Sequence, residues 1–336
     1  MIDMSTSNLA VIVLNWNGPQ DTIDCIDSLL NQSVPVDIII VDNGSVDGSA
    51  EIIEKKYKNI KVLKQNHNLG FAGGVNVGIK YSIDNNYPFI ALFNNDATAD
   101  KNWASMLTQK TEEDDSIGIV TGLLLNSSGE FIDSTGEQYS NWGLPFPRSR
   151  DHKRTKAPDG GLTFGATGGA SLYKTKMLRN IGLFDEDFFA YYEDADISFR
   201  AQLAGWKVAY EPKAIAYHKQ GATANKISGF AVYQTFKNLP LLFIKNIPTG
   251  LLFPIGIRFY FAYLLMLFNA IVKGNGKSAA KGAWMSFILG FKKLGERREI
   301  QKNKQVTTKY IRNMLWNDLP PEQTGLRKLR KLVGGK

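Results

Sequence analysis

The sequence predicts an α/β fold in which a mostly parallel sheet carries helices on both faces, followed by an apolar helical region. Over the first 125 residues, short apolar runs alternate with helical patterns, and this alternation is typical of a mostly parallel sheet. Past residue 225 the composition shifts to long apolar stretches. With 336 residues and 43% hydrophobic content, the chain is long enough for a sizeable core.

Five strands and four helices are predicted in the first part of the chain. The strands cover residues 9–15, 36–43, 60–66, 88–96 and 117–125, and the helices cover residues 22–30, 50–57, 72–83 and 103–111. Sheets of this kind bind ligands in the crevice at the carboxyl ends of their strands. Polar side chains follow several of these strands, so we expect the functional site at that edge of the sheet.

The following residues are predicted to complete the same domain, which we place at residues 1–225. Residues 126–165 are rich in Gly, Pro, Ser and charge, which predicts a long irregular insertion with a few short strands. A strand and the start of a helix are predicted at 168–178, and a helix at 193–204. Two further strands, WKVAYEP and AIAYH, end near His218.

The region from 226 to 290 is predicted to be apolar, helical and membrane-associated. Residues 251–272 contain one charge, Arg258, and their 22 residues are enough to cross a bilayer. Because Pro254, Arg258 and Asn269 interrupt this apolar run, we expect a helical hairpin that lies in the membrane interface. A spanning helix and ordinary buried helices are the alternatives.

Positive charge is concentrated in the last segment, a basic tail at residues 291–336. This segment holds 13 Lys and Arg against 4 Asp and Glu, while the whole chain has a net charge of +8. Near its end, LRKLRKLV (326–333) surrounds one apolar helical side with basic residues, a pattern that binds anionic membrane surfaces. We therefore expect an anionic membrane, and not a nucleic acid, as a partner.

The chain has a single cysteine, Cys25, which excludes an internal disulfide and fits a reducing compartment. Its N-terminus has an acidic residue where an export signal has lysines, and its apolar run is short. Together with the apolar region, these features lead us to expect the protein at the cytoplasmic face of the cell membrane.

Two turns after the early strands are candidates for nucleotide binding. Asp42 ends the second strand and could accept hydrogen bonds from a ribose or base, whereas capping alone explains the turn after it. NHNLGFAGGVNVG (66–78) is a Gly-rich turn into a helix, which suits a phosphate at a helix N-terminus. It follows the third strand and lacks the G-x-G-x-x-G spacing, so a redox dinucleotide enzyme is disfavoured.

The fourth strand ends in FNNDATAD, where Asn94, Asn95 and Asp96 follow one another. An Asp with neighbouring oxygens in such a crevice suits Mg²⁺ or Mn²⁺ carrying a diphosphate. His218, at the end of a later strand, is a candidate further ligand, although a lone His is more often structural.

Six motifs follow one another between residues 9 and 223. They are IVLNWN, VDNGSxDGS, NLGFAGGxNxG, NND after the fourth strand, GGA, and GLFDEDFFAYYEDADISFRAQLAGW. As an ordered set they resemble the family-2 inverting glycosyltransferases, and more narrowly the rhamnosyltransferase-like branch that builds bacterial cell-surface polysaccharides. The resemblance implies a GT-A fold, a nucleotide-sugar donor and a divalent metal, Mg²⁺ or Mn²⁺.

The resemblance also implies roles for the residues in these motifs. They are Asn15, Asn17 and Asp42 at the nucleoside, Asn68 and Asn76 at the donor's phosphate and sugar, and Asp96 and His218 at the metal. Asn94 and Asn95, next to Asp96, are further candidates for binding the donor. Asp96 matches the last Asp of the family's D-x-D position, and His218 matches a family metal ligand. Asn94 replaces the first Asp of that position, which removes one charge and puts the metal's affinity in doubt.

YYEDADISFR places three carboxylates, Glu193, Asp194 and Asp196, at the start of a predicted helix. Asp196 lies three residues after Glu193 and four before Arg200, so a surface charge ladder explains it. Asp194 shares its face with apolar residues three and seven positions later, the face that packs inward. Burial raises a carboxylate's pKa, as a general base requires. The resemblance gives this role to the second residue of the Glu-Asp pair, so we predict Asp194 as the base and Glu193 as the reserve.

The expected activity is transfer of a sugar, with inversion, from a nucleotide donor to a lipid-linked or polysaccharide acceptor. Overall likeness favours dTDP-L-rhamnose as the donor, and UDP-hexoses are the alternative. A nucleotidyltransferase is disfavoured because LNWNGPQD has no lysine or arginine for a phosphate loop. A non-catalytic nucleotide-sugar-binding scaffold is supported by Asn94 alone. The acceptor's identity and the formation of a homo-oligomer stay open.

Overall fold

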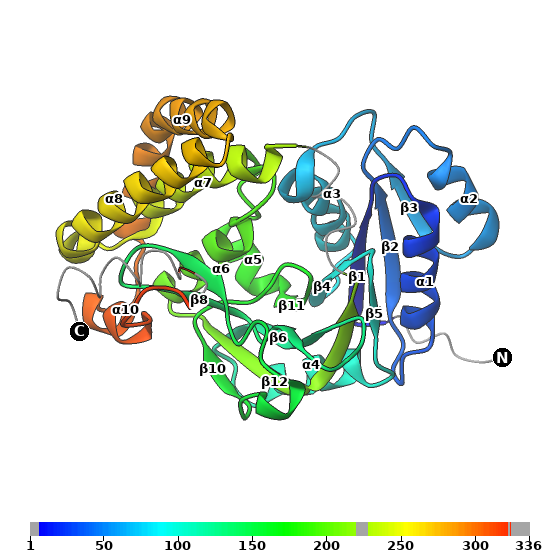
Figure 1. The fold of residues 1–336 in the computed structure, drawn as a ribbon. Helices are drawn as coiled ribbons and strands as arrows, with labels where there is room; N and C mark the ends of the chain where they lie inside the picture. The colour runs from blue at the N-terminus through cyan, green and yellow to red at the C-terminus, as the bar shows by residue number, and fades with distance from the viewer. Residues whose placement is uncertain (1–6, 220–227, 322, 324–336) are drawn as a thin grey trace.

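The computed structural model describes residues 7–219, 228–321 and 323, and its α/β fold with a C-terminal group of helices confirms the predicted fold class (Figure 1). The strands are β1 (Leu9–Asn15), β2 (Asp37–Asp42), β3 (Lys61–Lys64), β4 (Phe89–Asn94), β5 (Ala97–Ala99), β6 (Ile117–Asn126), β7 (Ile132–Ser134), β8 (Glu137–Tyr139), β9 (Pro145–Pro147), β10 (Gly161–Thr163), β11 (Ala170–Lys174) and β12 (Lys207–His218). The α-helices are α1 (Pro19–Leu30), α2 (Ser49–Lys56), α3 (Gly70–Asp84), α4 (Trp103–Glu112), α5 (Thr175–Ile181), α6 (Glu193–Leu203), α7 (Phe230–Asn246), α8 (Thr249–Val272), α9 (Gly276–Lys302) and α10 (Thr308–Met314), and the 3-10 helices are η1 (Arg154–Lys156) and η2 (Glu186–Phe188).

One sheet runs through the molecule in the order β10-β12-β6-β11-β4-β1-β2-β3, with β5 beside β12 and β7 beside β6. Strands β4, β1, β2 and β3 are parallel, as predicted for the first part of the chain. Strand β11 lies antiparallel between β4 and β6, and β12 is parallel to β6, so the sheet as a whole is mixed. The parallel part brings the ends of β1, β2 and β4 to one edge.

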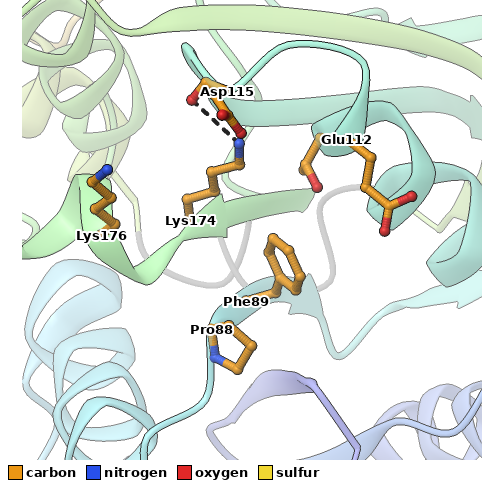
Figure 2. A pocket seen from close by; sticks show the side chains of 7 residues that line it. Pro88, Phe89, Glu112, Asp115, Lys174 and Lys176 are labelled. Carbon is orange, nitrogen blue, oxygen red and sulfur yellow. Dashed lines mark hydrogen bonds between the residues drawn. The ribbon is translucent and has the colours of Figure 1, made fainter.

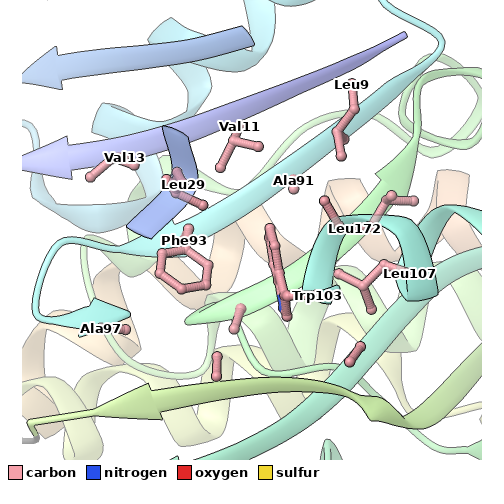
Figure 3. Packing of buried hydrophobic residues seen from close by; sticks show 14 of the residues in the cluster. Leu9, Val11, Val13, Leu29, Ala91, Phe93, Ala97, Trp103, Leu107 and Leu172 are labelled. Carbon is pink, nitrogen blue, oxygen red and sulfur yellow. The ribbon is translucent and has the colours of Figure 1, made fainter. Parts of the chain in front are cut away.

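Helices cover both faces of the sheet, because side chains of each strand alternate between two hydrophobic cores. Val11 and Val13 of β1 face the core formed with α1, α2 and α4, which includes Phe93 and Trp103 (Figure 3). Ile12, between them, faces the core formed with α3, α5 and α6. This two-sided burial explains why the early strands are almost continuously apolar.

A third core joins the C-terminal helices to α6. Phe188 and Phe199 pack there with Leu241 and Leu242 of α7 and with Ile311 of α10. Helix α6 therefore lies between the sheet on one side and α7 on the other. Among the described residues, α8 alone is long and apolar enough to cross a membrane, by length and composition only, with a mean hydropathy of 1.9 over 18 residues.

Three predicted boundaries differ in the structure. The two strands expected before His218 form one strand, β12, with an irregular register between Glu211 and Ile215. Pro212 lies in this irregularity, and a proline cannot donate a ladder hydrogen bond. The predicted fourth strand ends at Asn94, and β5 follows separately. The expected boundary between residues 290 and 291 falls inside α9, and residues 326–333 lie outside the described part of the chain.

Candidate active site

Asn15 and Asp42 meet where β1 and β2 end. The two residues are partners in the parallel register, and Asn15 Nδ2 donates a hydrogen bond to Asp42 Oδ1 at 2.7 Å. Asn15 is fully buried, and its amide oxygen accepts a hydrogen bond from Thr22 Oγ1 at 2.6 Å. Ser45 donates its hydroxyl to Asp42 at 2.6 Å. Asn15 therefore orients Asp42, and its own amide is fully engaged within the protein.

Asn17 joins the loops that follow these two strands. It adopts a left-handed backbone conformation with φ of 56° and is partly exposed. Its amide oxygen accepts a hydrogen bond from the backbone N–H of Val46 at 3.0 Å. Its own N–H donates to Ser45 Oγ at 2.9 Å. Asn17 and Asp42 thus lie in one connected turn structure at the edge of the parallel sheet.

The Gly-rich turn before α3 is held by two asparagine side chains. Asn43 donates to the carbonyl of Gly70 at 3.0 Å and accepts from the N–H of Leu69 at 3.0 Å. Asn68 accepts from the N–H of Gly70 at 2.7 Å. Gly70 has a φ of 73°, and a Cβ there would lie 2.4 Å from the carbonyl oxygen of Phe189. Glycine is therefore required where the start of α3 meets the turn before α6.

Asn76, predicted at the donor's phosphate and sugar, has a different place. It is buried inside α3, and its side chain both donates to the carbonyl of Phe184 (2.8 Å) and accepts from its N–H (3.1 Å). It also donates to Glu186 at 2.9 Å. These contacts engage both polar atoms of the amide, so Asn76 ties α3 to the segment before α6 instead of facing a ligand.

Asp96 and His218 form the candidate metal centre. Asp96 Oδ1 lies 3.0 Å from His218 Nε2, and Asn94 Nδ2 lies 3.3 Å from the same nitrogen. His218 Nδ1 lies 2.7 Å from the carboxylate of Asp133, which in turn pairs with Arg150 at 2.9 Å. Although burial lowers it, the hydrogen bonds to Asp133 and Asp96 raise the pKa of His218 to about 9.

These residues fit a divalent cation. A carboxylate oxygen and an imidazole nitrogen converge at the sheet's functional edge, and both are ligand types of Mn²⁺. The second nitrogen of His218 is held by a carboxylate, the arrangement that orients metal-bound histidines. Asn95, a further candidate for binding the donor, points elsewhere: it donates to Thr22 Oγ1 at 3.1 Å and so joins the network around Asn15.

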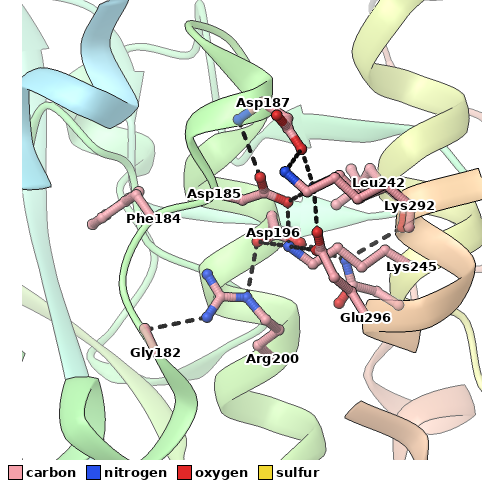
Figure 4. A network of polar contacts seen from close by, with 12 residues as sticks. Gly182, Phe184, Asp185, Asp187, Asp196, Arg200, Leu242, Lys245, Lys292 and Glu296 are labelled. Atoms are coloured by element: carbon pink, nitrogen blue, oxygen red, sulfur yellow. Dashed lines mark hydrogen bonds and ion pairs between the residues drawn. The ribbon is translucent and has the colours of Figure 1, made fainter. Parts of the chain in front are cut away.

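A second acidic group does not fit a cation, because lysines already occupy it. Ligand atoms of Asp185, Asp187 and Glu296 lie within 4.8 Å of one another. The ammonium group of Lys293 pairs with all three, and Lys245 pairs with Asp185 and Glu296 (Figure 4). This group is an ion-pair network that ties the segment before α6 to α7 and α9.

Glu193 and Asp194 lie side by side at the start of α6. Asp194 is partly exposed and accepts hydrogen bonds from the N–H groups of Gly168 (3.1 Å) and Ala195 (2.8 Å). Glu193 is 7% exposed, and its Oε2 has no hydrogen-bond partner. Burial, and next the charge of Asp194, raise the pKa of Glu193 to about 8. Burial also raises the pKa of Asp194, against the hydrogen bonds from Gly168 and Ala195.

Glu193 and Asp194 are suited to different protonation states at neutral pH. Glu193 keeps its proton because its carboxylate would be buried and unpaired. Asp194 has two N–H donors that stabilise its ionised form, so it carries the pair's negative charge. An ionised, partly exposed carboxylate with a raised pKa can accept a proton from a bound hydroxyl.

The GGA motif connects the candidate metal centre to this carboxylate pair. Gly169, just before β11, accepts a hydrogen bond from the N–H of Asn94 at 2.8 Å. Its neighbour Gly168 donates to Asp194, as described above. A Cβ on Gly169 would lie 3.0 Å from the side chain of Asn94. Two small residues thus bring the end of β4 and the start of α6 to one place.

Asp196, expected in a surface charge ladder, is buried. It pairs with Arg200 as the spacing predicted, at 2.9 Å, but its side chain is fully inaccessible to solvent. Lys245 and Asn246 of α7 supply further donors at 3.0 and 2.8 Å. The surface prediction was wrong because the sequence pattern of α6 does not indicate that a second layer of helices covers this face.

Several contributors to the site carried no recognisable sequence signal. Asp133, which orients His218, lies in the irregular insertion, and Thr22 lies in α1.

A surface depression lined by Pro88, Phe89, Thr111, Glu112, Asp115, Lys174 and Lys176 lies at the opposite edge of the sheet, where β4 begins and the antiparallel β11 ends (Figure 2). It is therefore separate from the candidate active site.

Comparison with known proteins identifies the family. The family described as Glycosyl transferase family 2 matches residues 10–182, just over half of the chain. The chain belongs to glycosyl transferase family 2. This membership makes the protein a glycosyltransferase and confirms the family expected from the ordered motifs.

One relative agrees with this assignment, and solved structures share the fold. The chain is 26% identical over 214 residues to the N-acetylglucosaminyl-diphospho-decaprenol L-rhamnosyltransferase of Mycobacterium tuberculosis, covering 56% of this chain and 68% of that protein. Its fold is similar to the mannosyltransferase PcManGT of Pyrobaculum calidifontis, solved with GDP-Man and Mn²⁺ (TM-score 0.53, 13% identity, 88% and 85% of the two chains). It is also similar to residues 1–349 of S. aureus TarS (TM-score 0.56, 16% identity, 92% and 93%).

Proposed function

We propose that this family-2 glycosyltransferase moves a sugar from a nucleoside diphosphate donor to a hydroxyl of a lipid-linked or glycan acceptor, with inversion of the anomeric carbon. One observation carries the proposal. The Asp96–His218 pair adjoins Asn94, which hydrogen-bonds to Gly169, and the neighbouring Gly168 donates to Asp194, with Glu193 buried beside Asp194. A metal-ligand pair next to a carboxylate with a raised pKa suits a leaving diphosphate and an attacking hydroxyl.

The donor is proposed to be a dTDP-sugar, with dTDP-L-rhamnose favoured. The support is the likeness to the mycobacterial L-rhamnosyltransferase and the ordered motifs of that branch. UDP-hexoses are the alternative donors. We propose that Asn17 and Asp42 contact the nucleoside and that the turn of Asn68, at the start of α3, lies beside the diphosphate.

The proposed reaction breaks the bond between the anomeric carbon and the diphosphate oxygen and forms a bond from that carbon to the acceptor oxygen. Asp194 accepts the proton of the acceptor hydroxyl, while Glu193 stays protonated beside it. Asp96 and His218, with Asn94 adjacent, are proposed to hold Mg²⁺ or Mn²⁺. When bound, this cation neutralises the charge of the departing diphosphate.

The acceptor is proposed to be presented at an anionic membrane, on its cytoplasmic face. The support is the composition of the C-terminal helices, where residues 249–295 contain six Lys and Arg and no Asp or Glu. Large apolar side chains of α8 and α9 are exposed in the same region, among them Phe253, Phe268 and Trp284. Such a surface suits the membrane interface.

A turnover measurement on purified protein tests the proposal. Release of nucleoside diphosphate is measured with dTDP-, UDP- and GDP-sugars, with Mn²⁺, and with a polyprenyl diphosphate-linked acceptor. We expect turnover with one donor class, loss of turnover on chelation, and a loss of about 10³-fold in Asp194→Asn. Glu193→Gln, which imitates the protonated side chain, is expected to lose less than about tenfold.

Two results contradict the proposal in different ways. Full turnover in Asp194→Asn, with none in Glu193→Gln, reverses the roles of the two carboxyls. Nucleotide-sugar binding without turnover across the donor and acceptor panel supports the non-catalytic scaffold instead.

A further inference from the structure

The turn that leads into the carboxylate pair is conformationally strained. Phe189, Tyr191 and Tyr192 have φ values of 63°, 71° and 72°, and none of them is a glycine. Each such residue costs on the order of 1 kcal/mol or more, and the conformation persists only where surrounding contacts hold it. Glu193 and Asp194 follow directly, so the shape of this turn sets the position of the proposed base.

Asn238 of α7 holds this turn through its side-chain amide. Its Nδ2 donates to the carbonyl oxygens of Phe188 (2.9 Å), Ala190 (2.9 Å) and Tyr191 (2.8 Å). Asn238 is fully buried. A turn with left-handed residues leaves carbonyl groups without regular hydrogen-bond partners. The buried NH₂ group of Asn238 contacts three such carbonyls within four residues, so it fits this turn specifically.

Lys237, the neighbour of Asn238, contacts the same segment one step earlier. Its Nζ donates to the carbonyl oxygens of Asp187 (2.8 Å) and Phe188 (3.2 Å), and the residue is 5% exposed. Burial lowers the pKa of Lys237 to about 8. A buried lysine and a buried asparagine, adjacent on α7, both direct their donors at backbone carbonyls of one short segment.

On its other side, the turn contacts the start of α3. The N–H of Ala72 donates to the carbonyl of Phe189 at 3.1 Å, and Gly70 lies against the same carbonyl. The ring of Phe189 also meets that of Phe230, the first residue of α7, at 6.1 Å between centroids. The turn is therefore clamped between the helix proposed to face the donor diphosphate and a helix outside the part of the chain that matches the family.

We propose that Asn238, assisted by Lys237, is a positioning residue of the transferase: α7 holds the strained turn in the shape that presents Asp194 to the acceptor hydroxyl. This inference rests on the proposed role of Asp194. It gives the C-terminal helices a part in the reaction beyond any contact with a membrane.

The test compares Asn238→Leu with Gln202→Leu. Gln202 is the matched control because it too is a buried side-chain amide that donates to two backbone carbonyls, those of Thr163 (3.1 Å) and Phe164 (2.9 Å), away from the turn. We expect kcat to fall about 100-fold or more in Asn238→Leu, with the KM for the donor changed less than threefold. Gln202→Leu is expected to keep kcat within threefold.

A second measurement does not depend on turnover. Backbone hydrogen exchange of the segment from Phe188 to Ala195, followed by mass spectrometry, is expected to accelerate at least tenfold in Asn238→Leu and to stay unchanged in Gln202→Leu. Lys237→Met keeps the side chain's length without its charge. It is expected to lower kcat and to accelerate exchange of this segment, each by a smaller factor than Asn238→Leu.

The outcomes separate this inference from the proposed function. Unchanged exchange in Asn238→Leu overturns the inference whether or not the wild-type protein transfers a sugar. Faster exchange with an unchanged kcat shows a purely structural contact and overturns it as well. A wild-type protein that turns over no donor contradicts the proposed function, and the positioning role falls with it.

Discussion

At the scale of the residue, three carboxylates within four positions have three different environments. Glu193 is buried without a partner for one oxygen, Asp194 is partly exposed with two N–H donors, and Asp196 is buried among cations. Sequence spacing predicted the helix, the pairing of Asp196 with Arg200 and the separate placement of Asp194. It could not predict the burial of Asp196, because the cover comes from α7, some fifty residues later in the chain.

The buried carboxyl of Glu193 makes stability depend on pH. Its pKa is about 8 in the folded protein against 4.5 for the free group, so the folded state binds the proton more tightly. This contribution is fully present below pH 4.5 and is lost as pH rises through about 8. Glu193→Gln has no proton to lose and so keeps this stability at high pH. At pH 9 we expect the free energy of unfolding of Glu193→Gln to exceed that of the wild type by on the order of 4 kcal/mol.

Urea unfolding of both proteins at pH 6 and pH 9 measures this difference. The exposed Glu112 provides the control, since Glu112→Gln is expected to leave the pH dependence as it is in the wild type. Parallel pH dependences in wild type and Glu193→Gln would show that Glu193 is ionised in the folded protein at neutral pH.

Asn94 sets the charge of the candidate metal centre. Its amide nitrogen is 3.3 Å from His218 Nε2, at the position where the resemblance implied the first Asp of a D-x-D motif. Cation affinity rises with the number of charged ligands, so Asn94→Asp is expected to lower the Mn²⁺ concentration for half-maximal turnover about tenfold. Asn95→Asp is the control, because Asn95 donates to Thr22 and does not contact His218. Equal shifts in the two variants would indicate a general electrostatic effect instead of coordination.

At the scale of the element, the early strands and helices were predicted closely. The order of the strands in the second half of the sheet was not predicted. Predicted helices at 22–30 and 103–111 correspond to α1 and α4 within a few residues. Hydrophobic periodicity reports local burial, which is strong where a strand is covered on both faces. It carries no information on the antiparallel insertion of β11 between β4 and β6, because strand order depends on contacts distant in sequence.

An ion-pair network joins α6, α7 and α9. Its charged residues are scattered along the sequence, so no local pattern predicts that they pair. Asp196 is fully buried and receives donors from Arg200 and Lys245 (Figure 4) and from Asn246. Although burial opposes it, Lys245 and Arg200 hold the pKa of Asp196 below its ordinary value. Removing the carboxylate charge of Asp196 leaves the buried cations of Arg200 and Lys245 without their counter-charge.

Asp196→Asn is therefore expected to lower the free energy of unfolding by about 3–5 kcal/mol. Glu113→Gln breaks the exposed pair with Lys110 and serves as control, with an expected change of less than about 1 kcal/mol. Urea denaturation at pH 7 measures both. A change in Asp196→Asn as small as that of the control would mean that the network's desolvation cost already cancels its pairing.

At the scale of the whole molecule, the C-terminal helices α7, α8 and α9 lie together at one end (Figure 1). On α8 the exposed large side chains Phe253, Ile257, Phe261, Leu264 and Phe268 recur at helical spacing and so share one face. The sequence predicted an apolar helical region here and left open whether its helices are buried. Mean hydropathy could not decide this, because a core helix and an interfacial helix are equally apolar.

The exposed face of α8 and α9 gives the last prediction, that the protein docks on anionic membranes by this surface. Trp284, Phe287 and Phe291 of α9 recur at helical spacing and are exposed. Burying such side chains in the interface, beside exposed lysines, favours vesicles that contain anionic lipid. Phe261→Ser combined with Phe287→Ser is expected to weaken co-sedimentation with phosphatidylglycerol-containing vesicles at least tenfold, and high salt is expected to weaken binding of the wild type.

The control removes exposed apolar side chains elsewhere, with Leu30→Ser combined with Leu162→Ser, since these are 58% and 54% exposed on other parts of the molecule. It is expected to bind vesicles like the wild type. Because the proposed active site lies at the sheet's edge, the α8–α9 variant should also keep turnover with a short, soluble acceptor while losing it with a vesicle-embedded one. Wild-type vesicle binding in the α8–α9 variant would instead assign this apolar face to contact with another protein chain, and the acceptor would then have to reach the site without membrane docking.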